Sequence, residues 1–149
     1  MPRLGLIADT HGLLRPQALV ALEGCDRILH AGDVGEGDIL EALGRLAPVV
    51  AVAGNCDDRP DLPAEARLSV GGVRILLRHG HLPEEAAPEA DVVVSGHTHV
   101  PLVAAEGGRL RVNPGSAGPR RFRLPVTVGI LLLGEGAPRA EIVELDLGP

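Results

Sequence analysis

The stretch "LGLIADTH" (Leu4–His11) starts as a run of apolar residues and ends in side chains that can bind a proton or a metal ion. An apolar run that stops at Asp9, with Gly12 shortly after it, predicts a buried strand that enters a loop. Several later stretches repeat this order of apolar run and polar end. The pattern therefore bears on the fold and on the chemistry together.

The first part of the chain alternates between predicted strands and predicted helices. Helices are predicted for Pro16–Leu22, with its proline in the first turn, and for the amphipathic stretch "DILEALGRL" from Asp38. Strands are predicted for residues 27–32 and 48–54, and the second of these is a β-branched run typical of a buried parallel strand. A β-α-β-α-β order favours a parallel sheet with right-handed crossovers.

The rest of the chain is predicted to form hairpins and one more buried strand. Residues 67–70 and 73–78 flank Gly71 and Gly72, which form a two-residue loop typical of a β-hairpin. A stretch rich in Pro and Glu comes next, in which a helical turn is expected, and then the buried strand "DVVVSG" from Asp91. Hairpins of a second, mostly antiparallel sheet are predicted for residues 101–113, 126–133 and 140–146. Together these elements predict an α/β sandwich of two sheets.

Length and composition limit the classes of protein that fit. At 149 residues the chain suits a single domain, residues 1–149, and shows no internal repeat. Apolar residues make up 45%, but with one Phe and no Trp or Tyr the core must be aliphatic. A net charge of −6 argues against nonspecific binding to nucleic acid or to an anionic membrane, which needs a basic face. A small anionic substrate remains compatible with a locally positive site.

The cysteines and the apolar runs bear on where the protein works. Cys25 and Cys56 lie far apart and form no C-x-x-C motif. No basic N-terminal segment is followed by a long apolar stretch, and the longest apolar run, residues 128–133, is far too short to span a bilayer. We therefore expect a reduced, cytoplasmic protein without a membrane segment.

Five apolar runs stop at residues that can bind a metal ion: Asp9 and His11, Asp33, Asn55, His79, and His97 with His99. The carboxyl ends of strands in an open α/β sheet face one crevice, so these side chains can meet. Each has an ordinary interpretation by itself, because Asp33 or Asn55 alone is a common turn residue and a His-x-His pair is often a surface pair. The evidence for a metal site is that all five runs end in this way. His30 lies inside a run and is predicted to have a buried, hydrogen-bonded role behind the ligands.

Seven donors are too many for one tetrahedral zinc ion, and they include no thiolate. Carboxylate, amide and imidazole groups suit two divalent ions, with Asp33 able to bridge them through its two oxygens. Manganese is expected first, and zinc, iron, nickel or cobalt also fit the donor set. Two such ions can activate water and hold a phosphate, and their charge exceeds that of the two carboxylates.

The motifs also resemble those of a known enzyme family. The series "DTH", "GDV", "GNCD", "HGH" and "GHTH" is similar to that of the calcineurin-like metallophosphoesterases, in particular their small YfcE-like phosphodiesterase branch. The motif "NPGS" at Asn113–Ser116 matches that branch too, so the resemblance covers nearly the whole chain. It implies a four-layer α-β-β-α sandwich of two mixed β-sheets flanked by helices, with a dinuclear metal centre.

The resemblance implies a role for each motif residue. One ion would be held by Asp9, His11, Asp33 and His99, and the other by Asp33, Asn55, His79 and His97. A hydroxide between the ions would attack the phosphorus of a small phosphodiester in line, while Asn55 helps to stabilise the developing charge. Asn113 and Ser116 are expected to contact substrate.

Cys56 marks a departure from larger relatives, which have a histidine there that can protonate the leaving group. It is a candidate catalytic and substrate-contacting residue, with a small buried hydrophobe as the alternative. Asp57 is expected to orient its loop or to cap the segment after it, and His81 to touch either phosphate or a carboxylate behind the ligands. A solvated loop face, with substrate contact as the alternative, is predicted for the cluster of Arg120, Arg121 and Arg123.

Functions outside enzymology also fit this fold. A non-catalytic scaffolding or binding module is the main alternative, because a subunit of the retromer complex has the fold but has departed from the ligand set. All seven ligands are present here, which favours the enzyme. Ions held only for structure would instead predict unfolding on chelation. The physiological substrate, the native metal and the oligomeric state, including a homo-oligomer, stay open.

Overall fold

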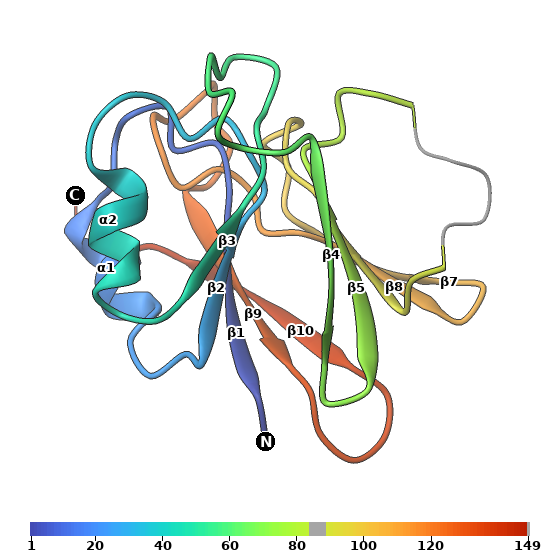
Figure 1. Cartoon of the computed structure of the whole chain (residues 1–149). Coiled ribbons are helices and arrows are strands. Elements are labelled where there is room, and N and C mark those ends of the chain that lie inside the picture. Colours follow the sequence, from blue (N-terminus) through green and yellow to red (C-terminus); the bar gives the residue numbers. More distant parts are fainter. Residues whose placement is uncertain (84–88, 149) are drawn as a thin grey trace.

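The computed structural model describes residues 1–83 and 89–148, which form two five-stranded sheets packed face to face (Figure 1). The first sheet has the strand order β10-β9-β1-β2-β3. Its parallel strands are β1 (Arg3–Ile7), β2 (Arg27–His30) and β3 (Val49–Ala51). Strand β9 (Thr127–Leu132) pairs antiparallel with both β1 and β10 (Arg139–Glu144). The predicted α/β fold of two mixed sheets is confirmed.

The second sheet has the order β4-β5-β6-β8-β7. Its strands are β4 (Glu65–Val70), β5 (Val73–Arg78), β6 (Val92–Val94), β7 (Leu102–Glu106) and β8 (Arg109–Asn113). The hairpin predicted around Gly71 and Gly72 is confirmed as β4–β5. The central strands β5, β6 and β8 run parallel, and only the edge strands pair antiparallel. The prediction of a mostly antiparallel second sheet is therefore wrong.

The last hairpin lies in a different sheet from the one predicted. Strands β9 and β10 join the first sheet, where Gly5 of β1 pairs with Ile130 of β9. The first five residues of β9 are buried, as a strand between two others and between two apolar layers must be. The apolar run from Val126 to Leu133, interrupted only by Thr127, carried this signal, because an exposed hairpin would alternate in polarity.

The helices cover the first sheet. α1 (Pro16–Ala21) and α2 (Ile39–Gly44) lie on its outer face, at the left of Figure 1, and α1 begins at the predicted proline. Among the described residues no helix covers the second sheet. The helical turn predicted for the stretch rich in Pro and Glu falls largely on residues 84–88, which lie outside the described residues. None of the described helices has the length and apolar character needed to cross a membrane.

The core is aliphatic, as predicted. Leu6, Leu29 and Leu131 of the first sheet pack against Leu77 and Val94 of the second. A second apolar cluster lies between the first sheet and its helices. The single Phe is outside both clusters. The two sheets therefore form one body, which fixes the ends of their strands relative to one another.

Candidate metal centre

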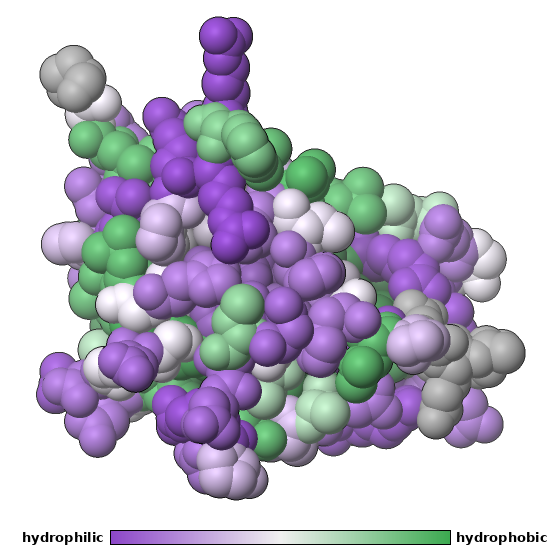
Figure 2. Space-filling model, turned by 90° about the horizontal axis from the view of Figure 1, so that it is seen from above, coloured by the Kyte–Doolittle hydropathy of each residue, from purple (hydrophilic) through white to green (hydrophobic). Residues whose placement is uncertain are grey.

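The carboxyl ends of β1, β2, β3, β5 and β6 lie at one end of the molecule, at the top of Figure 1. Seen from above, this end is mainly hydrophilic, with scattered hydrophobic side chains among the polar ones (Figure 2). Within the described residues, three groups bring their ligand atoms within 4.8 Å of one another: Asp9–His11–His99, Asp33–His79–His97 and His11–Asp33–Cys56. Asn55 joins them, with its Oδ1 3.0 Å from Nε2 of His79. The seven predicted ligands thus lie together.

The Oδ1 atom of Asp9 is buried and has no hydrogen-bond partner among the described residues. Three imidazole nitrogens surround it: Nε2 of His99 at 3.5 Å, of His79 at 3.8 Å and of His11 at 3.9 Å. These separations are too long for hydrogen bonds. They approach the spacing of neighbouring ligands around one ion, about 3 to 3.5 Å for bonds of about 2.1 Å. The residues present therefore fit a metal ion next to this oxygen.

Asp33 lies between the two halves of the cluster. Its Oδ2 is 3.3 Å from Nε2 of His79 and 3.6 Å from Nε2 of His11. Its Oδ1 accepts a hydrogen bond from the backbone N–H of Cys56 at 2.8 Å. Asp33 belongs to the group with His79 and His97 and also to a group with His11, which is itself part of the group of Asp9, so this one carboxylate faces both sides of the cluster. A ligand that bridges two metal ions must lie between two groups of donors in this way.

The hydrogen bonding of His79 shows where the lone pair on its Nε2 points. Its buried ring places Nδ1 2.8 Å from the carbonyl oxygen of Ala31, to which only an N–H can donate. Burial lowers the pKa of His79, which favours a neutral ring with its proton on Nδ1. Nε2 then directs a lone pair toward oxygens of Asn55 and Asp33. A cation between these three acceptors would stabilise the arrangement.

The charges of the cluster also suit cations. Burial and the Asp33 carboxylate raise the pKa of Asp9 to about 7, although a backbone N–H of His97 and the charge of Arg121 partly offset the rise. Burial, together with the charge of Arg121, lowers the pKa of His99 to about 4. His99 is thus neutral near pH 7, which is the form that binds metal. Divalent ions would relieve the repulsion between the two carboxylates.

The backbone of the ligands is unusual. Left-handed φ angles occur at five predicted ligands: Asp9 (54°), His11 (46°), Asp33 (53°), His97 (73°) and His99 (65°). Phe122 is the sixth non-glycine residue with this conformation in the described part of the chain. L-residues rarely adopt it, and such strain gathers where a site requires one side-chain direction. The strain is a second, independent mark of a functional site.

Two glycines of the motifs make room for the carboxylates. A Cβ on Gly54, before Asn55, would overlap the side chain of Asp33. A Cβ on Gly96, before His97, would lie 3.0 Å from Oδ2 of Asp9. These positions therefore need glycine for close approach.

His30 is fully buried and joins two ligand loops, as predicted. Its Nδ1 accepts the backbone N–H of Gly32 at 3.1 Å, so its proton is on Nε2, which donates to Oγ1 of Thr10 at 3.0 Å. Thr10 donates in turn to the carbonyl oxygen of Val34 at 2.7 Å. Burial lowers the pKa of His30 to about 4, which keeps the ring neutral. Sequence reasoning missed Thr10, whose only signal was its place inside "DTH".

Asp57 orients the loop after β3, as one of its two predicted roles required. Its carboxylate accepts the backbone N–H groups of Gly54 at 2.9 Å, Gly35 at 3.0 Å and Val34 at 3.1 Å. Burial opposes its ionisation, but the three hydrogen bonds outweigh burial and lower the pKa. The loop that carries Asn55 is thereby tied to the loop that follows β2.

Asn113 and Ser116, which were expected to contact substrate, are buried behind the ligand loops. Nδ2 of Asn113 donates to the carbonyl oxygen of Gly96 at 3.0 Å and to Oγ1 of Thr98 at 3.1 Å. Oγ of Ser116 donates to the carbonyl oxygen of Asp9 at 3.1 Å. Their polar atoms hold the backbone of two ligand loops and the side chain of Thr98, so the structure shows a positioning role for both, and contact with substrate stays a prediction.

Cys56 lies at the open side of the cluster. It is exposed, so the alternative of a small buried hydrophobe is wrong. Its Sγ groups with His11 and Asp33, and Nδ2 of the exposed Asn55 lies 3.7 Å from it. A thiol here can face a bound ester.

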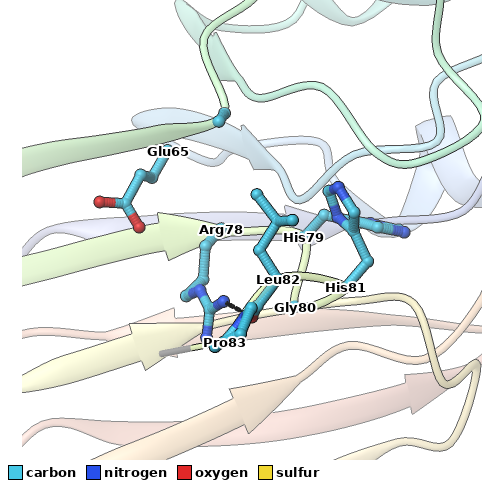
Figure 3. Close-up of a pocket in the computed structure, with 8 residues that line it drawn as sticks. Glu65, Arg78, His79, Gly80, His81, Leu82 and Pro83 are labelled. Carbon is cyan, nitrogen blue, oxygen red and sulfur yellow. Dashed lines mark hydrogen bonds between the residues drawn. The ribbon is translucent and has the colours of Figure 1, made fainter. Parts of the chain in front are cut away.

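A pocket of about 300 Å³ opens beside the cluster on the side of His79 (Figure 3). His81 lines it, and its ring centroid lies 5.4 Å from that of His79. Nδ1 of His81 is buried without a hydrogen-bond partner among the described residues. The two imidazoles lie at one end of the pocket, and Glu65 lies at the other. His81 is thus placed beside the space where a phosphate ester can enter.

The basic cluster of Arg120, Arg121 and Arg123 is exposed, as predicted for a solvated loop. Arg121 nevertheless acts on the metal centre, because its charge lowers the pKa of both Asp9 and His99. The loop is therefore not an isolated face.

The fold and the clustered donors define a phosphoester hydrolase that uses metal ions. Residues 3–136 match the family model of the calcineurin-like phosphoesterase superfamily domain. The chain belongs to this superfamily, so the predicted family and enzyme class are confirmed.

Comparison with individual proteins shows which members of the superfamily the chain resembles. The chain is 32% identical to a probable metallophosphoesterase of Methanocaldococcus jannaschii, over 96% of this chain and 81% of that protein. It is 32% identical to the phosphodiesterase YfcE of Escherichia coli, over 88% of each. Wild-type Vps29 from Entamoeba histolytica, complexed with Zn²⁺, has a similar structure: the TM-score is 0.74, the identity 22%, and the coverage 95% of this chain and 98% of that one. At that identity the likeness shows the fold alone.

Proposed function

We propose that this chain is a phosphodiesterase that hydrolyses a small phosphodiester at a centre of two divalent ions, manganese foremost. Zinc, iron, nickel and cobalt also suit the donors. The observation that carries the proposal is the buried Oδ1 of Asp9, which has no hydrogen-bond donor among the described residues and has three imidazole nitrogens within 3.9 Å. A buried carboxylate oxygen is unfavourable unless a proton, a donor or a cation meets it.

The donors divide between two ions that share Asp33. One ion would lie among Asp9, His11, Asp33 and His99, and the other among Asp33, Asn55, His79 and His97. The grouping of ligand atoms supports this division, because His11 and His99 group with Asp9 whereas His79 and His97 group with Asp33.

When bound, the two ions would activate a water for in-line attack on phosphorus and neutralise charge on the phosphate. The residues of the chain position the reaction. The hydrogen bonds of His30, Thr10 and Asp57 hold the carboxylates in one geometry. Asn55 is exposed and can offer its amide to a phosphate oxygen as charge develops. Cys56 stands beside it at the open side.

A binding module on the same fold is the alternative function. Such a module would not need five ligands held in a strained backbone conformation, since strain persists only where surrounding structure enforces it. The strained ligands and the intact donor set favour catalysis.

The test is hydrolysis of bis(4-nitrophenyl) phosphate by protein loaded with Mn²⁺. We expect turnover that a chelator abolishes and added metal restores, while circular dichroism shows that the chelated protein stays folded. Asp9→Asn should remove turnover, and Asp61→Asn, which breaks only an exposed ion pair with Arg59, should keep it.

Other outcomes point elsewhere. A folded, metal-loaded protein that is inert on both monoesters and diesters contradicts the enzyme and supports the binding module. Unfolding on chelation would assign the ions a structural role.

A further inference from the structure

Phe122 is the one aromatic side chain outside the histidines, and it is 92% exposed. Its φ angle of 53° is left-handed, a conformation that the other non-glycine residues of the described chain adopt only at predicted ligands. A large apolar side chain in water on a strained backbone is unfavourable twice over. An exposed aromatic of this kind suggests a ligand that covers the ring.

The turn that carries Phe122 is fixed next to the metal centre. The backbone N–H of Leu124 donates to the carbonyl oxygen of Arg121 at 3.1 Å, which closes the turn. Three residues earlier, Gly118 touches the loop of Asp9, since a Cβ on Gly118 would overlap the carbonyl oxygens of Asp9 and Thr10. Three residues of chain span at most about 11 Å, so the turn lies at the border of the cluster.

The surroundings of Phe122 are basic. Arg120, Arg121 and Arg123 are exposed, and the described part of the chain shows no ion pair for their side chains. On a chain with a net charge of −6, three positive charges beside an exposed ring form a local site for an anion that also carries a flat apolar group. Aromatic rings that stack on bases, next to arginines that face phosphates, are the means by which proteins hold single nucleotides without reading their sequence.

We propose that the turn of Arg121 and Phe122 is a substrate subsite that stacks a nucleobase on the Phe122 ring, so that the substrate is a nucleoside phosphodiester. Arg121 faces the phosphate at the metal centre, and Phe122 holds the base outside it. The inference rests on the proposed function and adds the class of substrate to it. A membrane surface is less favoured, because the turn borders the metal cluster and the charge of Arg121 reaches it.

Two diesters with the same leaving group test the subsite. Thymidine 5′-(4-nitrophenyl) phosphate and methyl 4-nitrophenyl phosphate carry equal charge and release the same phenol, but only the first has a base. We expect the Mn²⁺-loaded protein to prefer the thymidine ester in kcat/KM. Phe122→Ala should reduce that preference about 5-fold to 150-fold, the range for loss of one base–aromatic stack.

Variants separate stacking from other effects. Phe122→Tyr should keep the preference and Phe122→Leu should lose most of it, because only an aromatic face stacks. Arg121→Gln should lower kcat/KM for both esters alike, since they share the phosphate. Val20→Ala, at another exposed apolar residue, and Arg139→Gln, at the opposite end of the first sheet, serve as controls that change neither.

A binding measurement distinguishes failure of the subsite from failure of the proposed function. The chain has no Trp, so Phe122→Trp introduces a single fluorescent reporter. Thymidine 5′-phosphate should quench it and ribose 5-phosphate should not, whether or not any ester is hydrolysed. Equal quenching by both, or an unchanged ester preference in Phe122→Ala, overturns the inference. The inference is also overturned if Phe122→Ala reduces binding to phosphatidylserine vesicles and changes nothing else.

Discussion

The two sheets contribute unlike halves to the metal centre. The loops of the first sheet supply Asp9, Asp33 and Asn55 together with His11, and so bring all of its negative charge. The loops of the second sheet supply only imidazoles, from His79, His97 and His99. We therefore expect the half with the carboxylates to control whether cations bind, and the half with only imidazoles to control where they lie.

The two halves of the metal centre are also held in place by different hydrogen bonds. In the first half, the buried His30 and Thr10 join two loops and the half-buried Asp57 accepts three backbone N–H groups. In the second half, Nδ1 of His79 donates to the carbonyl oxygen of Ala31, and Nδ2 of Asn113 donates to the carbonyl oxygen of Gly96 and to Oγ1 of Thr98. A change to Asp33 or to Asp57 should therefore disturb both ions, and a change to His79 mainly one.

Asp33→Asn should have the largest effect. It removes the carboxylate that faces both groups, so we expect loss of both ions and a fall in turnover of more than about 100-fold, beyond the usual effect of a residue behind the ligands. His11→Ala should mainly weaken one ion. Metal content per chain, measured by atomic emission, compares the two. Two bound ions and normal turnover in Asp33→Asn would contradict the bridging position.

Asp57→Ala should have the next largest effect, although Asp57 is not expected to touch an ion. It frees three backbone N–H groups and unties the loop of Asn55, so we expect metal affinity to fall about 10-fold to 100-fold, the range for groups behind ligands. His79→Ala is the matched change in the second half and should affect mainly the ion that His79 is proposed to hold. Titration with Mn²⁺ resolves the two affinities, and equal losses at both ions in the two variants would remove the contrast between the halves.

The sequence predicted well which side chains would lie together, and it did so for a physical reason. Each ligand comes after an apolar run, and the parallel order of β1, β2 and β3 brings their carboxyl ends together whatever the details of packing. The left-handed backbone of Asp9 or His99 could not be predicted, because L-residues avoid it and only the assembled site enforces it. The hydrogen bonds by which Asn113 and Ser116 hold ligand loops were not predicted, since motif position does not reveal which way a side chain points.

The errors in the fold have a similar origin. Strand β9 reads locally as part of a hairpin, but its partner β1 lies at the other end of the chain. Pairing over that distance depends on which apolar layers remain open once the first three strands are formed. The hydrophobic pattern of the sequence alone does not specify this strand pairing.

His30→Gln should have a smaller effect, which is a change in how stability depends on pH in acid. The folded pKa of His30, about 4, is below the ordinary value of about 6.5, so the unfolded chain binds the extra proton first and stability falls as the pH drops below 6.5. Between pH 8 and pH 5 this amounts to roughly 2 kcal/mol. Urea unfolding of the metal-free protein should therefore show a flatter pH dependence in the variant. An unchanged slope would mean that His30 is not held neutral by burial.

Cys56→His should have the smallest effect on the first half, because Cys56 is exposed and the change leaves the seven ligands in place. A thiol is a poor proton donor near pH 7, so native turnover should depend strongly on the pKa of the leaving group. A well-placed general acid accelerates proton-requiring reactions about 100-fold to 10,000-fold, and an imperfectly aligned imidazole should still raise alkyl-ester turnover several-fold. Nitrophenyl esters should change little, since that leaving group departs without a proton. The measurement compares both proteins, at equal metal occupancy, over diesters of rising leaving-group pKa, and parallel slopes would show that position 56 does not face the leaving group.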